Sequence, residues 1–137
     1  MKYLIDTNIC IYLIKRKPPE VIQKLKRLHM DTIGISAITV SELEYGIEKS
    51  AHTEQNRIAL LEFLVPFTIL DYDQEASSEY GRIRTALEKK GKPIGAMDLL
   101  IAAHAKSKGL ILVTNNEKEF KRVEGLQVEN WVKSNKK

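Results

Sequence analysis

The sequence contains one cysteine, Cys10, and no long hydrophobic run. A single cysteine excludes an intrachain disulfide and a zinc site built from several thiolates of this chain. Its neighbours Ile9 and Ile11 favour a buried structural thiol. No apolar stretch approaches the roughly 20 residues that a membrane-spanning helix needs, and no long apolar segment follows Met1 and Lys2. We therefore expect a soluble, cytoplasmic protein without membrane contact.

The composition is that of a globular protein, with 137 residues of which 43% are hydrophobic and 29% charged. This length predicts a single domain over 1–137, with a core at 1–133 and a basic tail at 134–137. The formal net charge of +4 favours an anionic partner such as nucleic acid. Many small basic proteins bind no nucleic acid, so charge alone does not assign a function.

Short apolar stretches alternate with segments of helical periodicity along the whole chain. We expect strands at 3–5, 32–35, 67–70 and 110–113, with a further edge strand at 126–128. The helical segments are 9–15, 21–28, 37–47, 54–64, 73–90 and 98–105, with a short helix ending at Phe120. Gly91 and Gly109 are typical of helix C-termini. This alternation predicts an α/β fold with a central parallel β-sheet flanked by helices on both faces.

Three carboxylates stand where such a fold brings distant segments together. Asp6 follows the first strand, whereas Glu42 and Asp98 fall early in helices, and all three should meet at the carboxyl edge of the sheet. Clustered carboxylates repel each other, a cost that a divalent cation offsets. An all-oxygen site of this kind suits Mg²⁺.

Each residue also has a simpler interpretation. Asp6 is equally well explained as a helix N-cap, and Glu42 resembles an ordinary solvated helix residue. Asp98 points more strongly to function, because a carboxylate opening so apolar a helix needs a partner. His104 is expected to be a satisfied or interface histidine rather than a general base. Short polar residues at the same edge could orient ligands or simply form turns: Thr7, Asn8, Thr114, Asn115 and Asn116.

Four motifs in this order resemble the PIN-domain family, and within it the VapC-type toxins of bacterial toxin–antitoxin pairs. They span almost the whole chain, and lie at residues 4–8 (LIDTN), 35–46 (ISAITVSELEYG), 93–105 (PIGAMDLLIAAHA) and 113–120 (VTNNEKEF).

The resemblance implies a metal-dependent endoribonuclease that uses Mg²⁺, with Mn²⁺ able to substitute, and that in several members cuts transfer RNA. Asp6, Glu42 and Asp98 match the family's most dependable acids and would hold the metal. The fourth acidic position falls on Asn116 or passes to Glu119, and the number of metal ions stays open. The implied partners are an RNA substrate, a second copy in a homodimer, and a VapB-type antitoxin that lays its C-terminal segment across the active site.

Hydrolysis by in-line attack of water would leave a 5′-phosphate and a 3′-hydroxyl. Three rival functions use the same residues differently. A non-catalytic nucleic-acid-binding protein would keep the fold without turnover, and a DNA-directed nuclease would share the site chemistry. A receiver-like phosphotransfer domain would want adjacent acids after the first strand, where this chain has Asp6 and Thr7.

Overall fold

We describe the protein from a computed structural model in which residues 1–132 are described; the predicted basic tail at 134–137 lies outside them. The elements in chain order are β1 (Tyr3–Ile5), α1 (Thr7–Lys15), α2 (Pro19–Lys26), η1 (Met30–Thr32), β2 (Ile33–Ser36), α3 (Ala37–Glu48), α4 (Thr53–Leu64), β3 (Thr68–Leu70), α5 (Gln74–Lys89), α6 (Ala96–Ser107), β4 (Ile111–Val113), α7 (Glu117–Phe120) and β5 (Val128–Glu129).

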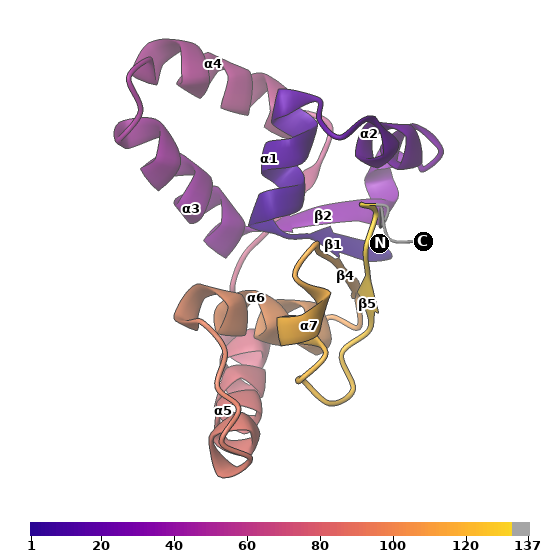
Figure 1. Cartoon of the computed structure of the whole chain (residues 1–137), viewed down its shortest axis with the longest axis vertical. Coiled ribbons are helices and arrows are strands. Elements are labelled where there is room, and N and C mark those ends of the chain that lie inside the picture. The colour runs from indigo at the N-terminus through magenta and orange to yellow at the C-terminus, as the bar shows by residue number, and fades with distance from the viewer. Residues whose placement is uncertain (133–137) are drawn as a thin grey trace.

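The strands form one five-stranded parallel sheet in the order β3-β2-β1-β4-β5, with β1 at the centre (Figure 1). Tyr3 of β1 pairs with Ile33 on one side and Ile111 on the other. All strands run in the same direction, so their carboxyl ends share one edge. The predicted parallel sheet is therefore confirmed, and its edge strand lies at Val128–Glu129 rather than 126–128.

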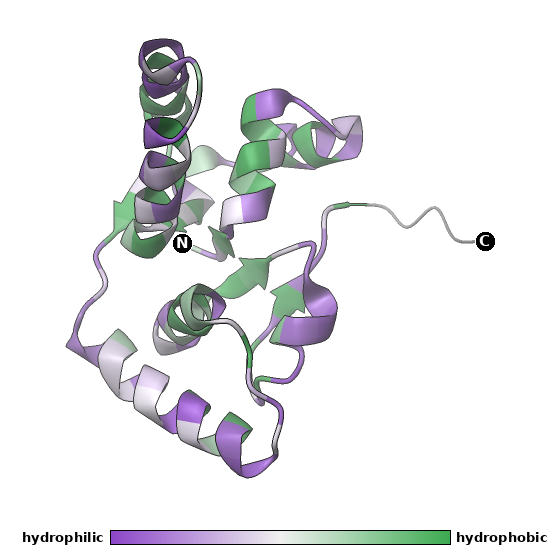
Figure 2. Ribbon diagram, turned by 60° about the vertical axis from the view of Figure 1, so that its left-hand side comes forward, coloured by the Kyte–Doolittle hydropathy of each residue, from purple (hydrophilic) through white to green (hydrophobic). Residues whose placement is uncertain are grey.

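Helices cover both faces of the sheet, with α1 to α4 on one side and α5 to α7 on the other (Figure 1). Alternate side chains of β1 point to opposite faces. Ile5 belongs to the core cluster shared with α1, α3 and α4, whereas Leu4 belongs to the cluster shared with α5 and α6. Figure 2 shows the apolar sides of these helices turned toward the sheet. The expected three-layer arrangement is confirmed.

Local signals explain where the helices begin and end. Helix α1 begins at Thr7, two residues before the expected start, because the Asp6 carboxylate accepts a hydrogen bond from Ile9 N–H at 3.0 Å and caps it. Gly91 and Gly109 follow α5 and α6 with φ near +66° and +65°, the left-handed conformation that glycine adopts without strain. Among residues 1–132, no helix is long and apolar enough to cross a membrane.

Candidate active site

The buried polar residues concentrate at the carboxyl edge of the sheet. Asp6 directly follows β1, Ser36 ends β2 and Thr114 directly follows β4, and none is more than 4% exposed. Thr39 lies in the first turn of α3 behind this edge and is fully buried. Polar groups are buried at a cost unless they are hydrogen-bonded, so their gathering here marks this edge as the candidate site.

Asp6 is both a helix cap and a member of an acidic cluster. One carboxylate oxygen, Oδ1, accepts the Ile9 N–H that begins α1. The pKa of Asp6 is raised to about 6, mainly by burial and also by the charge of Glu42, although hydrogen bonds from Thr114 and Ile9 act against the rise. The two interpretations of Asp6 are therefore compatible, because capping leaves the second oxygen for another ligand.

Asp98 lies in the first turn of α6 and points to the same cluster. Its pKa is raised to about 6, first by burial and then by the charges of Glu119, Asp6 and Glu42. Four carboxylates from four separate parts of the chain are thus close enough to repel one another. The predicted convergence of Asp6, Glu42 and Asp98 agrees with this geometry.

Glu42 is held by the start of α1. Thr7 donates a hydrogen bond from Oγ1 to Glu42 Oε1 at 2.5 Å, and the Thr39 hydroxyl lies 3.3 Å from the same Thr7 oxygen. Thr39 precedes Glu42 by one helical turn, so both reach Thr7 from the same face of α3. Sequence reasoning named Thr7 but missed Thr39, although its three-residue spacing from Glu42 was visible.

Glu119 is a fourth carboxylate in this neighbourhood, close to Asp98. Its Oε1 accepts the Gly95 N–H and its Oε2 accepts the Asn116 amide, both at 2.9 Å. These hydrogen bonds lower the pKa of Glu119. A Cβ at Gly95 would lie 3.8 Å from Asp98 Oδ2 and 3.9 Å from Glu119 Oε1, so the loop before α6 passes between both acids.

Two of the supporting residues expected at the site face elsewhere. Asn115 donates from its amide to Tyr12 Oη and accepts from Asn130, both at 3.2 Å, so its side chain lies along the rim of the site. Asn8 is exposed on the first turn of α1. Thr114 does contribute, because its hydroxyl accepts the Asn116 N–H at 2.9 Å and shapes the turn after β4.

The donor set suits a hard divalent cation. Four carboxylates with few nearby cations favour Mg²⁺ or Mn²⁺ over softer metals, since all donors are oxygen. In residues 1–132, no group of three or more such side chains is drawn together at metal-binding distance.

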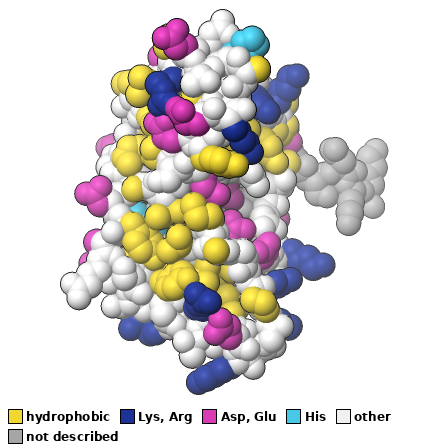
Figure 3. Space-filling view, turned by 90° about the vertical axis from the view of Figure 1, so that its left-hand side faces the viewer, with side chains coloured by type: hydrophobic (Ala, Val, Ile, Leu, Met, Phe, Trp, Pro, Cys, Tyr) yellow, Lys and Arg dark blue, Asp and Glu magenta, His cyan; other side chains and the backbone are white. Residues whose placement is uncertain are grey.

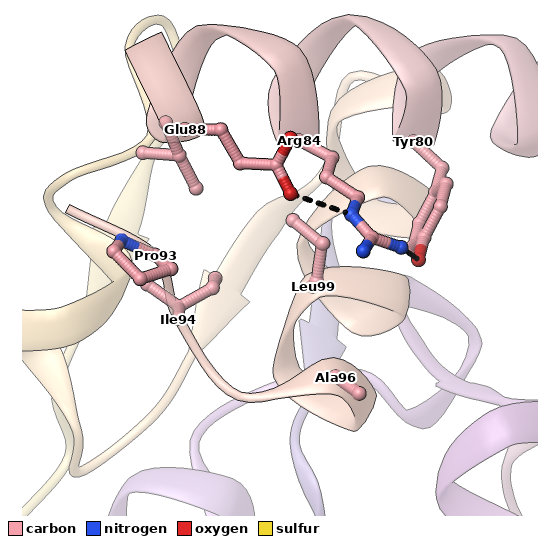
Figure 4. Close-up of a pocket in the computed structure, with 8 residues that line it drawn as sticks. Tyr80, Arg84, Glu88, Pro93, Ile94, Ala96 and Leu99 are labelled. Carbon is pink, nitrogen blue, oxygen red and sulfur yellow. Dashed lines mark hydrogen bonds and ion pairs between the residues drawn. The ribbon is translucent and has the colours of Figure 1, made fainter. Parts of the chain in front are cut away.

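A separate pocket of about 150 Å³ lies between α5 and the segment that leads into α6 (Figure 4). Arg84 on its rim donates to Glu88 and to Tyr80 Oη, both at 3.0 Å. Ala96 and Leu99 line it from the α6 side. The pocket adjoins the helix that carries Asp98, but none of the four acids lines it.

Known proteins are similar to this chain over almost its whole length. A family model described as PIN domain matches residues 3–126. Ribonuclease VapC2 of Haemophilus influenzae is 48% identical over 132 residues, covering 96% of this chain and 99% of the relative. A tRNA(fMet)-specific endonuclease VapC of Shigella flexneri is 45% identical, covering 96% of this chain and 98% of the relative.

The fold agrees with these matches. The crystal structure of VapBC2 from Rickettsia felis, bound to a fragment of promoter DNA, contains a chain that superposes with a TM-score of 0.91 and 45% sequence identity. The match covers 96% of this chain and all of that one. The parallel sheet, the acids at its carboxyl edge and these relatives lead to one conclusion: the chain belongs to the PIN-domain family, among the VapC ribonucleases.

Proposed function

We propose that this protein is a divalent-metal-dependent endoribonuclease that acts as the toxin of a toxin–antitoxin pair. The observation that carries the proposal is the convergence of Asp6, Glu42, Asp98 and Glu119, with the pKa of Asp6 and of Asp98 raised to about 6. Raised carboxylate pKa values at one edge of a parallel sheet indicate a site built for a cation rather than for stability.

Each acid has a distinct part in this site. Asp6 and Asp98 would hold Mg²⁺, Glu42 is oriented toward it by Thr7, and Glu119 supplies the fourth acid while Asn116 holds it in place. When bound, the cation supplies charge neutralisation at the scissile phosphate and lowers the pKa of the attacking water. Asp6 and Asp98, fixed at the N-terminal ends of α1 and α6, would hold the cation at one place on the carboxyl edge of the sheet.

RNA is the proposed substrate, and transfer RNA the first candidate. Relatives at 45% and 43% identity are named tRNA(fMet)-specific endonucleases. The face of the molecule in Figure 3 shows acidic side chains in its middle, an apolar area beside them, and Lys and Arg side chains above and below. Such flanking cations would attract the phosphate backbone toward the acids. Because RNA is the proposed substrate, we propose that the protein acts in the cytoplasm.

A VapB-type antitoxin is the proposed protein partner. VapBC is a family of toxin–antitoxin systems, and the Rickettsia felis structure is of such a complex. An apolar groove of about 310 Å³ lies between α1, α3 and α4, lined by Ile14, Leu43 and Leu60 among others. Glu42 stands on the rim of this groove, so an apolar segment bound there could present a basic residue to the acids.

The expected homodimer stays a prediction. Helix α4 exposes Ile58 and Leu61, and Val65 directly after it is also exposed; a second protein surface would cover these side chains. Light scattering of the purified toxin would measure its mass in solution.

The proposal is tested by incubating purified, antitoxin-free protein with total RNA and with an initiator transfer RNA transcript. We expect discrete fragments with a 5′-phosphate in Mg²⁺, none in chelator, and none with Asp98→Asn. The matched control is Asn115→Ala, whose side chain lies at the rim and should leave cleavage largely intact. Retained RNA binding without cleavage by folded wild type would instead favour the non-catalytic nucleic-acid-binding function. Cleavage of single-stranded DNA at a similar rate would favour the DNA-directed nuclease.

A further inference from the structure

A buried hydrogen bond joins the sheet edge to helix α6 behind the acids. Ser36 Oγ and His104 Nδ1 are 2.7 Å apart, although the residues are 68 positions apart in sequence. Both residues are fully buried. The ring of Tyr72 packs edge to face against the imidazole at 5.4 Å and closes it off.

Ser36 Oγ also links the imidazole to the start of α3. It accepts the Ile38 N–H at 3.1 Å, which caps α3. The other ring nitrogen, Nε2, is buried and makes no hydrogen bond of good geometry within residues 1–132. Burial lowers the pKa of His104 against the opposing effects of the Asp73 charge and the backbone of Asp71, which favours the neutral ring.

Burying this polar pair costs more than burying an apolar pair of similar shape would. His104 nevertheless places a polar ring in an otherwise apolar stretch of helix, beside Ala103 and Ala105. This favours a role for the Ser36–His104 bond beyond filling the core.

The bond joins the two elements that carry two of the acids. Ser36 caps α3 and precedes Glu42 by six positions, whereas Asp98 precedes His104 by six positions in α6. Each offset is about 9 Å along a helix axis. Helices α3 and α6 are also in direct contact. The bond therefore restrains α3 relative to α6, and with them Glu42 relative to Asp98.

We infer that His104 is a positioning residue: through its hydrogen bond to Ser36 it sets the separation of Glu42 and Asp98, and with it the affinity of the acidic cluster for a divalent cation. The inference rests on the proposed function only in requiring that these acids bind such a cation.

The test is a calorimetric titration of the full-length protein with Mn²⁺, beside a thermal melt of each variant. His104→Leu removes the ring nitrogen that bonds to Ser36 Oγ. We expect Mn²⁺ to bind about tenfold more weakly, because losing residues that support metal ligands typically weakens metal binding by this amount. His104→Asn places an amide oxygen near the position of Nδ1 and should restore most of the affinity. His104→Gln, which extends its amide toward the position of Nε2, should not.

A double variant separates positioning from folding. In His104→Leu with Ser36→Ala both partners are apolar, so this variant should be at least as stable as Ser36→Ala alone, which has lost the same α3 cap, while Mn²⁺ binding stays weak. Wild-type affinity in His104→Leu, or affinity that returns with stability in the double variant, would overturn the inference alone. A wild-type protein that binds no Mn²⁺ would overturn the proposed metal site as well, whereas Mn²⁺ binding without RNA cleavage would overturn only the nuclease.

Discussion

The central strands and the residues that follow them are equally buried but chemically opposite. Leu4, Ile5 and Leu112 in β1 and β4 are fully buried and apolar. Asp6 and Thr114, which come directly after these strands, are 4% and 0% exposed yet polar. Burial therefore stabilises the strands and opposes ionisation of the carboxylate next to them.

This difference shows where the molecule gives up stability for a site. Burial and neighbouring charge hold the pKa of Asp6 at about 6 rather than 3.8. The same sheet that buries Leu112 forces Asp6 into a place where its charge is unfavourable without a cation. Substitutions in the apolar strands should therefore act mainly on stability, whereas substitutions of the acid that follows β1 should act mainly on activity.

The largest expected effect is the loss of cleavage in Asp6→Asn. Asparagine caps helices as well as aspartate does, so the Ile9 hydrogen bond that begins α1 should survive. Without the charge, the cation loses a ligand, and we expect cleavage in Mg²⁺ to fall by about 10³-fold, or roughly 4 kcal/mol of transition-state stabilisation. Initial rates on the transfer RNA substrate measure the change. Asn8→Ala, on the exposed side of the same turn, is the control, and near-wild-type cleavage by Asp6→Asn would remove Asp6 from the site.

The next largest effect is expected from a substitution in the apolar strands. Leu112→Ala in β4 leaves a cavity between the sheet and α6 and should lower the free energy of unfolding by about 3 kcal/mol. Cleavage per folded molecule should change little at a temperature well below the melting transition. Denaturant unfolding together with rates measures both quantities. A loss of activity larger than the unfolded fraction would show that the core also determines the geometry of the acids.

The sequence predicts the fold well because parallel strands and helices carry strong periodic signals. Strand ends, the glycines after α5 and α6, and three acids at one edge all follow from local patterns and from the rule that carboxyl ends meet. The bounds shift by one or two residues where a side chain such as Asp6 acts as a cap.

The missed parts of the site depend on tertiary contacts. The spacing of Thr39 from Glu42 puts both on one face of a helix but does not show that they reach Thr7, and nothing local indicates that Ser36 meets His104 across 68 positions. The proposal of Glu119 rather than Asn116 as the fourth acid likewise depends on the loop at Gly95, whose N–H orients the Glu119 carboxylate. Sequence reasoning placed the acids on the right edge but could not determine which side chains hold them.

A smaller effect should appear in the pH dependence of stability without metal. The folded-state pKa of Asp6 lies above its unfolded value, so wild type loses stability as pH rises from about 4 to 6 and does not regain it above that range. Asp6→Asn lacks this penalty and should be more stable by about 2 to 3 kcal/mol above pH 6, with no difference below pH 4. Urea unfolding in chelator across this range measures it. An equal difference at every pH would mean that the charge of Asp6 is not the cause.

The smallest expected effect is at Glu119. Glu119→Gln keeps an oxygen for the Gly95 N–H but removes the charge that, after burial, contributes most to the raised pKa of Asp98. The pKa of Asp98 should therefore move down from about 6, which carboxyl NMR of the metal-free protein can follow. Cleavage should fall by about tenfold, or roughly 1.4 kcal/mol, because three acids still surround the cation.

Adding Asn116→Asp to Glu119→Gln returns an acid to the turn after β4 and should recover part of the rate. If the double variant is no faster and the pKa of Asp98 is unchanged, Glu119 acts as a brace for the loop before α6 and not as the fourth acid.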